Sequence, residues 1–176
     1  PFAISGNIIL SSDTTLRSPG LESLNRSLYN SMLKGDTSGS GRILKLIMTA
    51  LENGKTDSLT LSDSYYWMGV YYLIASRIQQ ASGYFALSTG IRERLGVRDT
   101  IYSKALFNVG TIQNSLGDYN KMEQYIRKSL EIDRGILGES NPKLAPSYSG
   151  LSTAYLGLKD YEMAIEYGKT ALKLIE

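Results

Sequence analysis

The fold is decided by residues 117–132, GDYNKMEQYIRKSLEI, which recur 42 positions later as residues 159–174, KDYEMAIEYGKTALKL. The similarity extends upstream, so two units align without a gap from Ser103 and from Ala145. In the second unit, residues at steps of three, four and seven are apolar or aromatic: Tyr148, Leu151, Tyr155, Tyr161, Ala164, Ile165, Ala171 and Leu172. This spacing predicts two amphipathic helices per unit, joined by a tight turn at Gly117-Asp118 or Lys159-Asp160.

Two further units lie upstream of this pair. One begins at Ser62, 41 residues before the next, and a more divergent one comprises residues 21–34 and 41–53. A single helix hairpin cannot bury its own apolar face, so such repeats stack and share a core. We therefore predict an all-α solenoid of about four antiparallel helix hairpins. The expected boundaries are an extended lead-in over 1–17 and units near 18–54, 62–96, 103–137 and 145–176.

Capping chemistry refines the expected helix starts. Ser18 and Asn141 each precede a proline, a residue suited to the first helical turn, and their side chains can accept backbone hydrogen bonds. Ser62 and Asp99 are the corresponding predictions for the two units between them. These four residues are therefore the expected N-caps.

Residues 145–174 place a small residue and an aromatic before a tight Asp-Tyr turn and end in Ala171-Leu172, and residues 103–132 follow this pattern well, with Gln113 in place of an aromatic. This pattern resembles the tetratricopeptide repeat. The spacing of 41 to 42 residues and the Asn141-Pro142 connector are similar to the long variety found in kinesin light chains and many bacterial repeat proteins. The resemblance implies a right-handed superhelix whose concave face binds a protein or peptide.

In that family, the first helix of each hairpin lines the concave surface. Carried onto this sequence, the resemblance implies a peptide-binding surface made of Asp63, Tyr66, Trp67, Val70, Leu73, Lys104, Phe107, Asn108, Thr111, Asn114, Ser149 and Thr153. Aromatic rings beside amide side chains suit an extended or helical peptide. The alternative is that Tyr66 and Trp67 pack in the core under the divergent first hairpin.

Composition excludes several classes of function. The 176 residues include no Cys and no His, which rules out thiolate and Ser-His catalysis, disulfides and the usual zinc sites. The carboxylates Glu93, Asp118, Glu131, Asp133 and Asp160 are scattered, and no phosphate-binding glycine motif is present. We therefore expect no enzymatic activity, no cofactor and no metal.

The formal net charge of +2 gives no reason to expect nucleic-acid binding, and no apolar run is long enough to span a bilayer. Localisation stays open between the cytoplasm and an extracytoplasmic compartment, because a leader removed before Pro1 would leave no trace.

Two other functions remain open beside the peptide-binding scaffold. The chain resembles the amino-terminal sensory or regulatory regions of larger bacterial enzymes and signalling proteins, such as those with CHAT-type proteases. Alternatively, the apolar residues from Leu172 to Ile175 form an uncapped end at which the chain self-associates. We expect either further repeats after Glu176 or a homo-oligomer formed through this helix.

Overall fold

The chain is helical, with short connections. This computed structural model describes residues 19–53 and 56–176, which form eight α-helices, one 3-10 helix and no strand. The expected lead-in over 1–17 and the Ser18 cap lie outside the described residues. The helices are α1 (Pro19–Leu33), α2 (Thr37–Asn53), α3 (Ser58–Ile74), α4 (Ile78–Leu95), α5 (Thr100–Ser115), α6 (Tyr119–Leu137), η1 (Pro142–Leu144), α7 (Ala145–Gly157) and α8 (Tyr161–Lys173).

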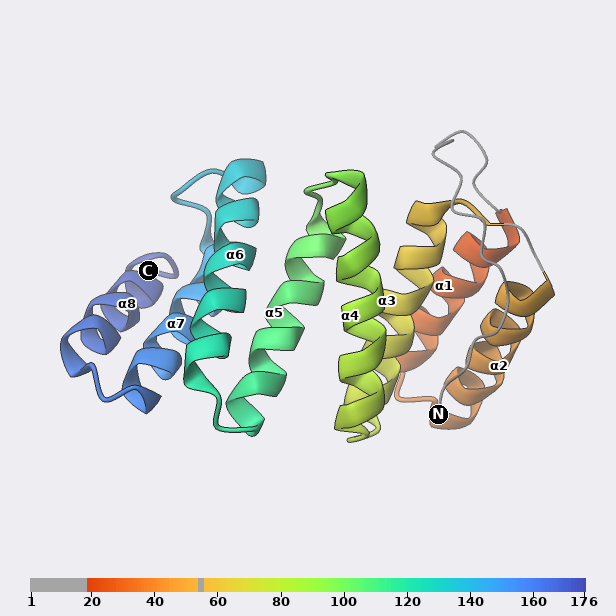
Figure 1. Cartoon of the computed structure of the whole chain (residues 1–176), viewed down its shortest axis with the longest axis horizontal. Helices are drawn as coiled ribbons and strands as arrows, with labels where there is room; N and C mark the ends of the chain where they lie inside the picture. Colours follow the sequence, from red (N-terminus) through yellow and green to blue (C-terminus); the bar gives the residue numbers. More distant parts are fainter. Residues whose placement is uncertain (1–18, 54–55) are drawn as a thin grey trace. The chain divides into compact units, whose positions relative to one another are not determined.

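Consecutive helices pair as antiparallel hairpins: α1 with α2, α3 with α4, α5 with α6, and α7 with α8 (Figure 1). Short connections favour such antiparallel neighbours. The hairpins fall into two compact units, one holding α1 to α4 and the other, from Gly96 onward, holding α5 to α8. The all-α hairpin fold predicted from the repeat is confirmed.

All four hairpin turns of the described residues use the same backbone conformation. Gly35, Ser76, Gly117 and Lys159 have φ values of 67°, 57°, 74° and 65°. Glycine adopts this left-handed region freely, whereas other residues incur a cost of about 1 kcal/mol or more. Because these residues are spaced by 41, 41 and 42 positions, the turn shows the repeat clearly even in the divergent first hairpin.

Side-chain caps fix where the helices begin. The prediction that Ser62 caps the third helix is wrong: α3 begins at Ser58, and Asp57 accepts hydrogen bonds of 3.0 and 2.9 Å from two backbone N–H groups. Ser62 lies one turn inside the helix and is fully buried. The Asp99 cap is confirmed by a 2.8 Å bond, and Asn141 caps η1 with a 3.0 Å bond.

The unit of α1 to α4 has its own core. Its fully buried apolar side chains include Leu28, Ile47, Ala81 and Phe85. Phe85 of α4 packs directly on the backbone of α3 at Gly69, where an added Cβ would lie 2.7 Å from the ring. In its contact with the preceding hairpin, α3 packs mainly against α1 and only slightly against α2.

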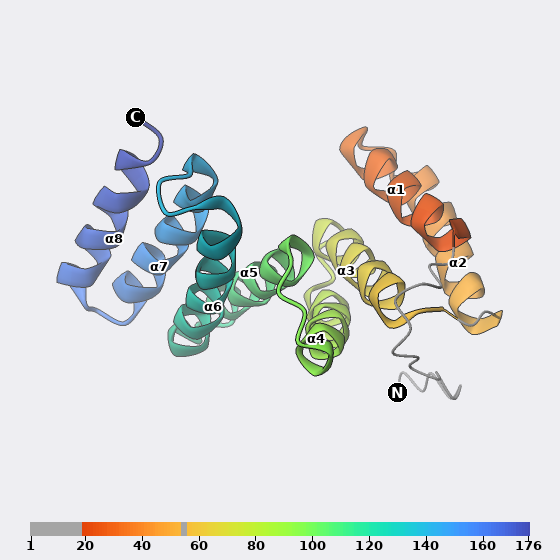
Figure 2. The ribbon, with the colours of Figure 1, turned by 90° about the horizontal axis from the view of Figure 1, so that it is seen from above.

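The unit of α5 to α8 is stacked differently. Here the contact of α7 with the preceding hairpin is made mainly with α6, the second helix of that hairpin (Figure 2). The core between them consists of Met122, Ile126, Leu130, Leu144, Leu151 and Ala154. In the other unit the equivalent contact is made mainly by the two first helices. The same hairpin pattern therefore supports two packing arrangements.

Candidate functional site

The predicted binding residues of the first unit lie on α3, and α1 adds an aromatic ring to them. The half-buried Trp67 ring lies 4.9 Å from the ring of Tyr29, measured between centroids, and Tyr29 is 40% exposed. Val70 lies one turn beyond Trp67 and is also half-buried. Tyr29 was missed by sequence reasoning because the first hairpin matches the repeat pattern weakly. The signal that could have identified Tyr29 was its position in the amphipathic segment of residues 21–34.

Two of the predicted α3 residues contact the interior of this unit. Tyr66 is only 6% exposed, and its ring centroid lies 5.9 Å from that of Phe85. The alternative of core packing therefore describes Tyr66 better than it describes Trp67. Asp63 forms an ion pair with the buried Arg92 of α4, and Leu73 is half-buried. Trp67 is the predicted aromatic of α3 with accessible ring surface.

The predicted residues of α5 form a polar row. Lys104 and Thr111 are exposed, whereas Asn108 and Asn114 are half-buried. Phe107 packs against the α6–α7 core. The hydroxyl of Thr111 donates a 3.1 Å hydrogen bond to the carbonyl oxygen of Phe107. The accessible groups of this row are therefore one ammonium, two amides and a hydroxyl oxygen.

The predicted residues of α7 repeat part of this row. Ser149 and Thr153 are exposed, and the Thr153 hydroxyl donates a 3.1 Å bond to the carbonyl oxygen of Ser149. Thr111 and Phe107 make the same contact 42 residues earlier. Each threonine uses its donor on its own helix, so its oxygen remains available as an acceptor. We call the exposed sides of α1 and α3 the first-helix surface of the first unit, and those of α5 and α7 the first-helix surface of the second unit.

A buried polar cluster joins α3 to α4 beside this surface. Arg92 is 1% exposed and donates hydrogen bonds to the Ser62 hydroxyl and to Asp63. Ser62 in turn donates a 2.8 Å bond to the carbonyl oxygen of Ser88. Burying a guanidinium is tolerated only when it is paired and hydrogen-bonded, as it is here.

The next hairpin holds the same cluster with its charges reversed. The positions 41 residues on are Ser103, Lys104, Ser129 and Asp133. Ser129 donates a 2.9 Å bond to the carbonyl oxygen of Ser103. Burial raises the pKa of the Asp133 carboxyl above its ordinary value, against the hydrogen bond from Ser103 and the charge of Lys104. The exposed Lys104 therefore acts on the charge of Asp133 as well as belonging to the first-helix surface.

A second polar cluster connects α6 with α7 and α8. Arg127 donates to Glu123 at 2.6 Å, to the Tyr155 hydroxyl at 2.9 Å and to the Tyr167 hydroxyl at 3.3 Å. The rings of Tyr155 and Tyr167 are stacked with centroids 5.4 Å apart. Burial, with the adjacent Glu123 charge, raises the pKa of Tyr155. Sequence reasoning missed this cluster because its members come from three helices.

Two of the scattered carboxylates, Asp118 and Asp160, cap helices. Asp118 and Asp160 each accept a 3.1 Å backbone hydrogen bond at the start of a helix. Within residues 19–53 and 56–176, no group of three acidic side chains could hold a metal ion. None of the helices in these ranges is both long and apolar enough to span a membrane.

Comparison with known proteins decides the family of the second unit. Residues 100–176 match the family model of the tetratricopeptide repeat. Those residues are tetratricopeptide repeats. A curated relative, the RxLR effector protein SFI4 of Phytophthora infestans, is 29% identical over 76 residues. That match covers 43% of this chain and only 22% of the effector.

Solved structures extend the likeness beyond the matched repeats. BtubC (BKLC) from P. vanneervenii is similar with a TM-score of 0.72 and 19% identity, covering 88% of this chain and 71% of that one. MamA is similar with a TM-score of 0.64 and 20% identity, covering 88% of this chain and 77% of that one. At these identities the likeness concerns the fold. Because the coverage exceeds residues 100–176, hairpins before the matched tetratricopeptide repeats share that fold.

Proposed function

We propose that the chain is a non-catalytic scaffold that binds a protein segment or peptide on its first-helix surface. The observation that carries the proposal is the pair of Tyr29 and Trp67, whose rings lie 4.9 Å apart on neighbouring helices. Tyr29 is 40% exposed and Trp67 is half-buried. Aromatic side chains with accessible faces bury much area at small entropic cost, as binding hot spots do.

The tetratricopeptide repeats of the second unit support the same function with polar groups. Asn108 and Asn114 present both donors and acceptors, which suit the backbone of a bound peptide. The exposed Thr111 and Thr153 offer acceptors on neighbouring first helices. Repeats of this family support a protein-interaction scaffold, and these polar side chains would hydrogen-bond a peptide on the second unit.

The non-catalytic part of the proposal rests on what the charged groups do. Arg92 and Asp63 hold α3 to α4, and Asp118 and Asp160 cap helices. Asp133 lies in the α5–α6 cluster. Groups engaged in such structural contacts are poor candidates for moving protons in a reaction. A binding role uses the side chains that these contacts leave accessible.

The test begins with peptides selected by display against the immobilised full chain and then synthesised. Trp67 is the only Trp of the chain, so its fluorescence should change when a peptide covers it. Tyr29→Ala and Trp67→Ala should each weaken binding at least tenfold by calorimetry, while far-UV circular dichroism stays unchanged. Leu46→Ala, at an exposed residue of α2, is the matched control. Peptides that bind both aromatic variants with wild-type affinity would exclude this surface.

Self-association is a second candidate, favoured by the outer side of α8 and the residues just after it. Tyr161, Ile165, Leu172 and Ile175 are 58 to 64% exposed there. In contrast, the side chain 42 positions before Leu172, Leu130 of α6, is buried against α7. Light scattering over a concentration series should then show a mass above that of the monomer. The double variant Ile165→Lys with Leu172→Lys should have the mass of the monomer. A monomer at every concentration would remove this candidate.

A further inference from the structure

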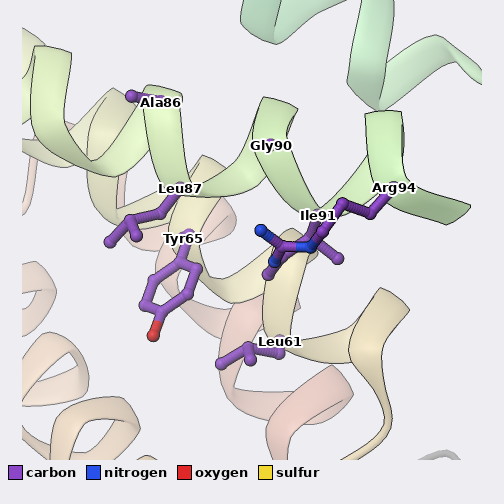
Figure 3. Close-up of a pocket in the computed structure, with 7 residues that line it drawn as sticks. All are labelled: Leu61, Tyr65, Ala86, Leu87, Gly90, Ile91 and Arg94. Carbon is purple, nitrogen blue, oxygen red and sulfur yellow. The ribbon is translucent and has the colours of Figure 1, made fainter. Parts of the chain in front are cut away.

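A small pocket lies on the hairpin of α3 and α4. It has a volume of about 220 Å³ and is lined by Leu61, Tyr65, Ala86, Leu87, Gly90, Ile91 and Arg94 (Figure 3). Leu61, Tyr65 and Ile91 are 2 to 4% exposed and form its apolar floor. Leu87 is 44% exposed at the rim. None of these residues belongs to the predicted binding surface.

The pocket depends on the absence of a side chain at Gly90. A Cβ added at Gly90 would meet no atom within 4 Å, so it would point into open space. Gly90 lies in the middle of α4, where glycine is unfavourable by roughly 1 kcal/mol compared with alanine. Here that glycine leaves the apolar floor accessible between Leu87 and Arg94.

The equivalent place on the next hairpin is built differently. The residues 41 positions after Leu87 and Gly90 are Lys128 and Glu131. The Lys128 ammonium lies 5.4 Å from the centroid of the Tyr102 ring, which takes the place of Leu61. A long polar side chain thus covers apolar surface that is accessible on the α3–α4 hairpin. The pocket is therefore a property of one hairpin and not of the repeat.

Size and charge define what could occupy the pocket. Its volume is below the roughly 300–1,000 Å³ of typical small-molecule sites, and it suits one apolar side chain. Arg94 is the charged residue of its lining, and Figure 3 shows the guanidinium group beside Ile91 at the pocket. Arg94 is exposed, and it forms no ion pair with the described residues. A carboxylate next to the bound side chain could pair with it in two parallel hydrogen bonds.

We propose that this pocket is a second peptide-binding site, which takes a Leu-type anchor residue next to an Asp or Glu of a partner protein. The anchor contacts Leu61, Tyr65 and Ile91, and the neighbouring carboxylate pairs with Arg94. The site acts independently of the first-helix surface, because the two sites use different residues of α3. Leu61 and Tyr65 line the pocket, whereas Trp67 and Val70 belong to the first-helix surface.

The test is an NMR titration of the full chain, observed at the methyl groups of Leu61, Leu87 and Ile91. The probe is the peptide acetyl-Gly-Ser-Asp-Leu-Asp-Ser-Gly-amide, with two matched peptides that carry Ser for Leu or Asn for both Asp. The parent peptide should shift these methyl signals with a dissociation constant of about 0.1–1 mM, as expected for one anchor and one exposed ion pair. The Ser peptide should cause no shift.

Three variants locate the binding. Gly90→Leu fills the pocket and should abolish the shifts, whereas Gly83→Leu, at another open position of α4, should leave them unchanged. Arg94→Gln should raise the dissociation constant of the parent peptide about fivefold and leave that of the Asn peptide unchanged. Equal binding by Gly90→Leu and the wild type would overturn the proposal. The proposal would also be overturned if the wild-type chain did not bind the peptide but a variant with Ile8, Ile9 and Leu10 replaced by Ser did. Residues 8–10 of this chain would then be the occupant of the pocket.

Discussion

Reversing the ion pair of Asp63 and Arg92 should place, in this hairpin, the charges that Lys104 and Asp133 carry at the equivalent positions of the next hairpin. Asp63→Lys alone leaves two cations facing each other, one of them on the 1%-exposed Arg92. Breaking a buried pair in this way costs about 3–5 kcal/mol, and the partial exposure of Asp63 favours the lower end. Arg92→Asp alone should cost a similar amount, because it leaves two carboxylates beside Ser62.

The double variant, Asp63→Lys with Arg92→Asp, should recover part of this loss. Charge complementarity is restored, and contacting residues typically couple by about 0.5–3 kcal/mol. Aspartate lacks two methylene groups of the buried arginine stem, which corresponds to roughly 1.6 kcal/mol of lost burial at about 0.8 kcal/mol each. With about 3 kcal/mol lost in each single variant and a coupling of up to about 3 kcal/mol, we expect the double variant to lose about 3–5 kcal/mol, which is less than the roughly 6 kcal/mol sum of the two single losses.

Urea unfolding followed by Trp67 fluorescence measures this effect directly, because the only Trp of the chain lies on α3 itself. Lys34→Asp, at an exposed site beyond α1, makes the same change in net charge as Asp63→Lys in the opposite direction and should stay within about 0.5 kcal/mol of the wild type. A coupling energy below about 0.5 kcal/mol would refute the reasoning, since the two charges would then act independently.

Three further predictions concern the unit of tetratricopeptide repeats. Gly110→Ala places a methyl group 2.8 Å from Ile126 and should lower the free energy of unfolding by about 1–3 kcal/mol in thermal denaturation, whereas Gly135→Ala, with open space at its Cβ, should be neutral or stabilising. Lys159→Gly relieves a φ of 65° and should raise that free energy by about 0.5–1 kcal/mol; an unchanged or lower melting temperature would contradict this. The pKa of Asp133 is raised in the folded state, so this carboxyl contributes stability that is fully present below its unfolded pKa and is lost as pH rises through the folded value. Asp133→Asn should therefore gain stability relative to the wild type as pH rises from 3 to 7, and a constant difference in melting temperature across that range would count against the shift.

The hairpin fold followed from the sequence because stacked repeats need the same interface residues at the same spacing. Ala164, which the repeat pattern places on the inner face of its helix, is buried, and so is Ala81 of α4. Start positions were less certain, because Ser62 and Asp57 are both acceptable caps and only tertiary packing decides between them. Ser62 is drawn into the interior by its hydrogen bond to Ser88.

The candidate site could be predicted only in part. Spacing along α3 places Tyr66 and Trp67 next to each other, but it does not show that Phe85 covers the first and leaves part of the second accessible. The contribution of Tyr29 depends on how α1 packs against α3, which periodicity within one helix does not encode. The pocket at Gly90 could not be predicted for the same reason, because its lining combines residues of α3 and α4 that only tertiary packing brings together.

The α3–α4 and α5–α6 hairpins carry opposite charges at equivalent positions, and this difference disfavours the pairing of wrong helices during folding. Repeats with nearly identical interfaces can pair out of step by one unit, which is a characteristic hazard of repeat proteins. If α6 took the place of α4 on α3, Asp133 would face Asp63, and if α4 took the place of α6 on α5, Arg92 would face Lys104. Both mispairings bring like charges together. Serines occupy equivalent positions in both hairpins, and the opposite charges beside them give each helix a complementary charge on its own partner.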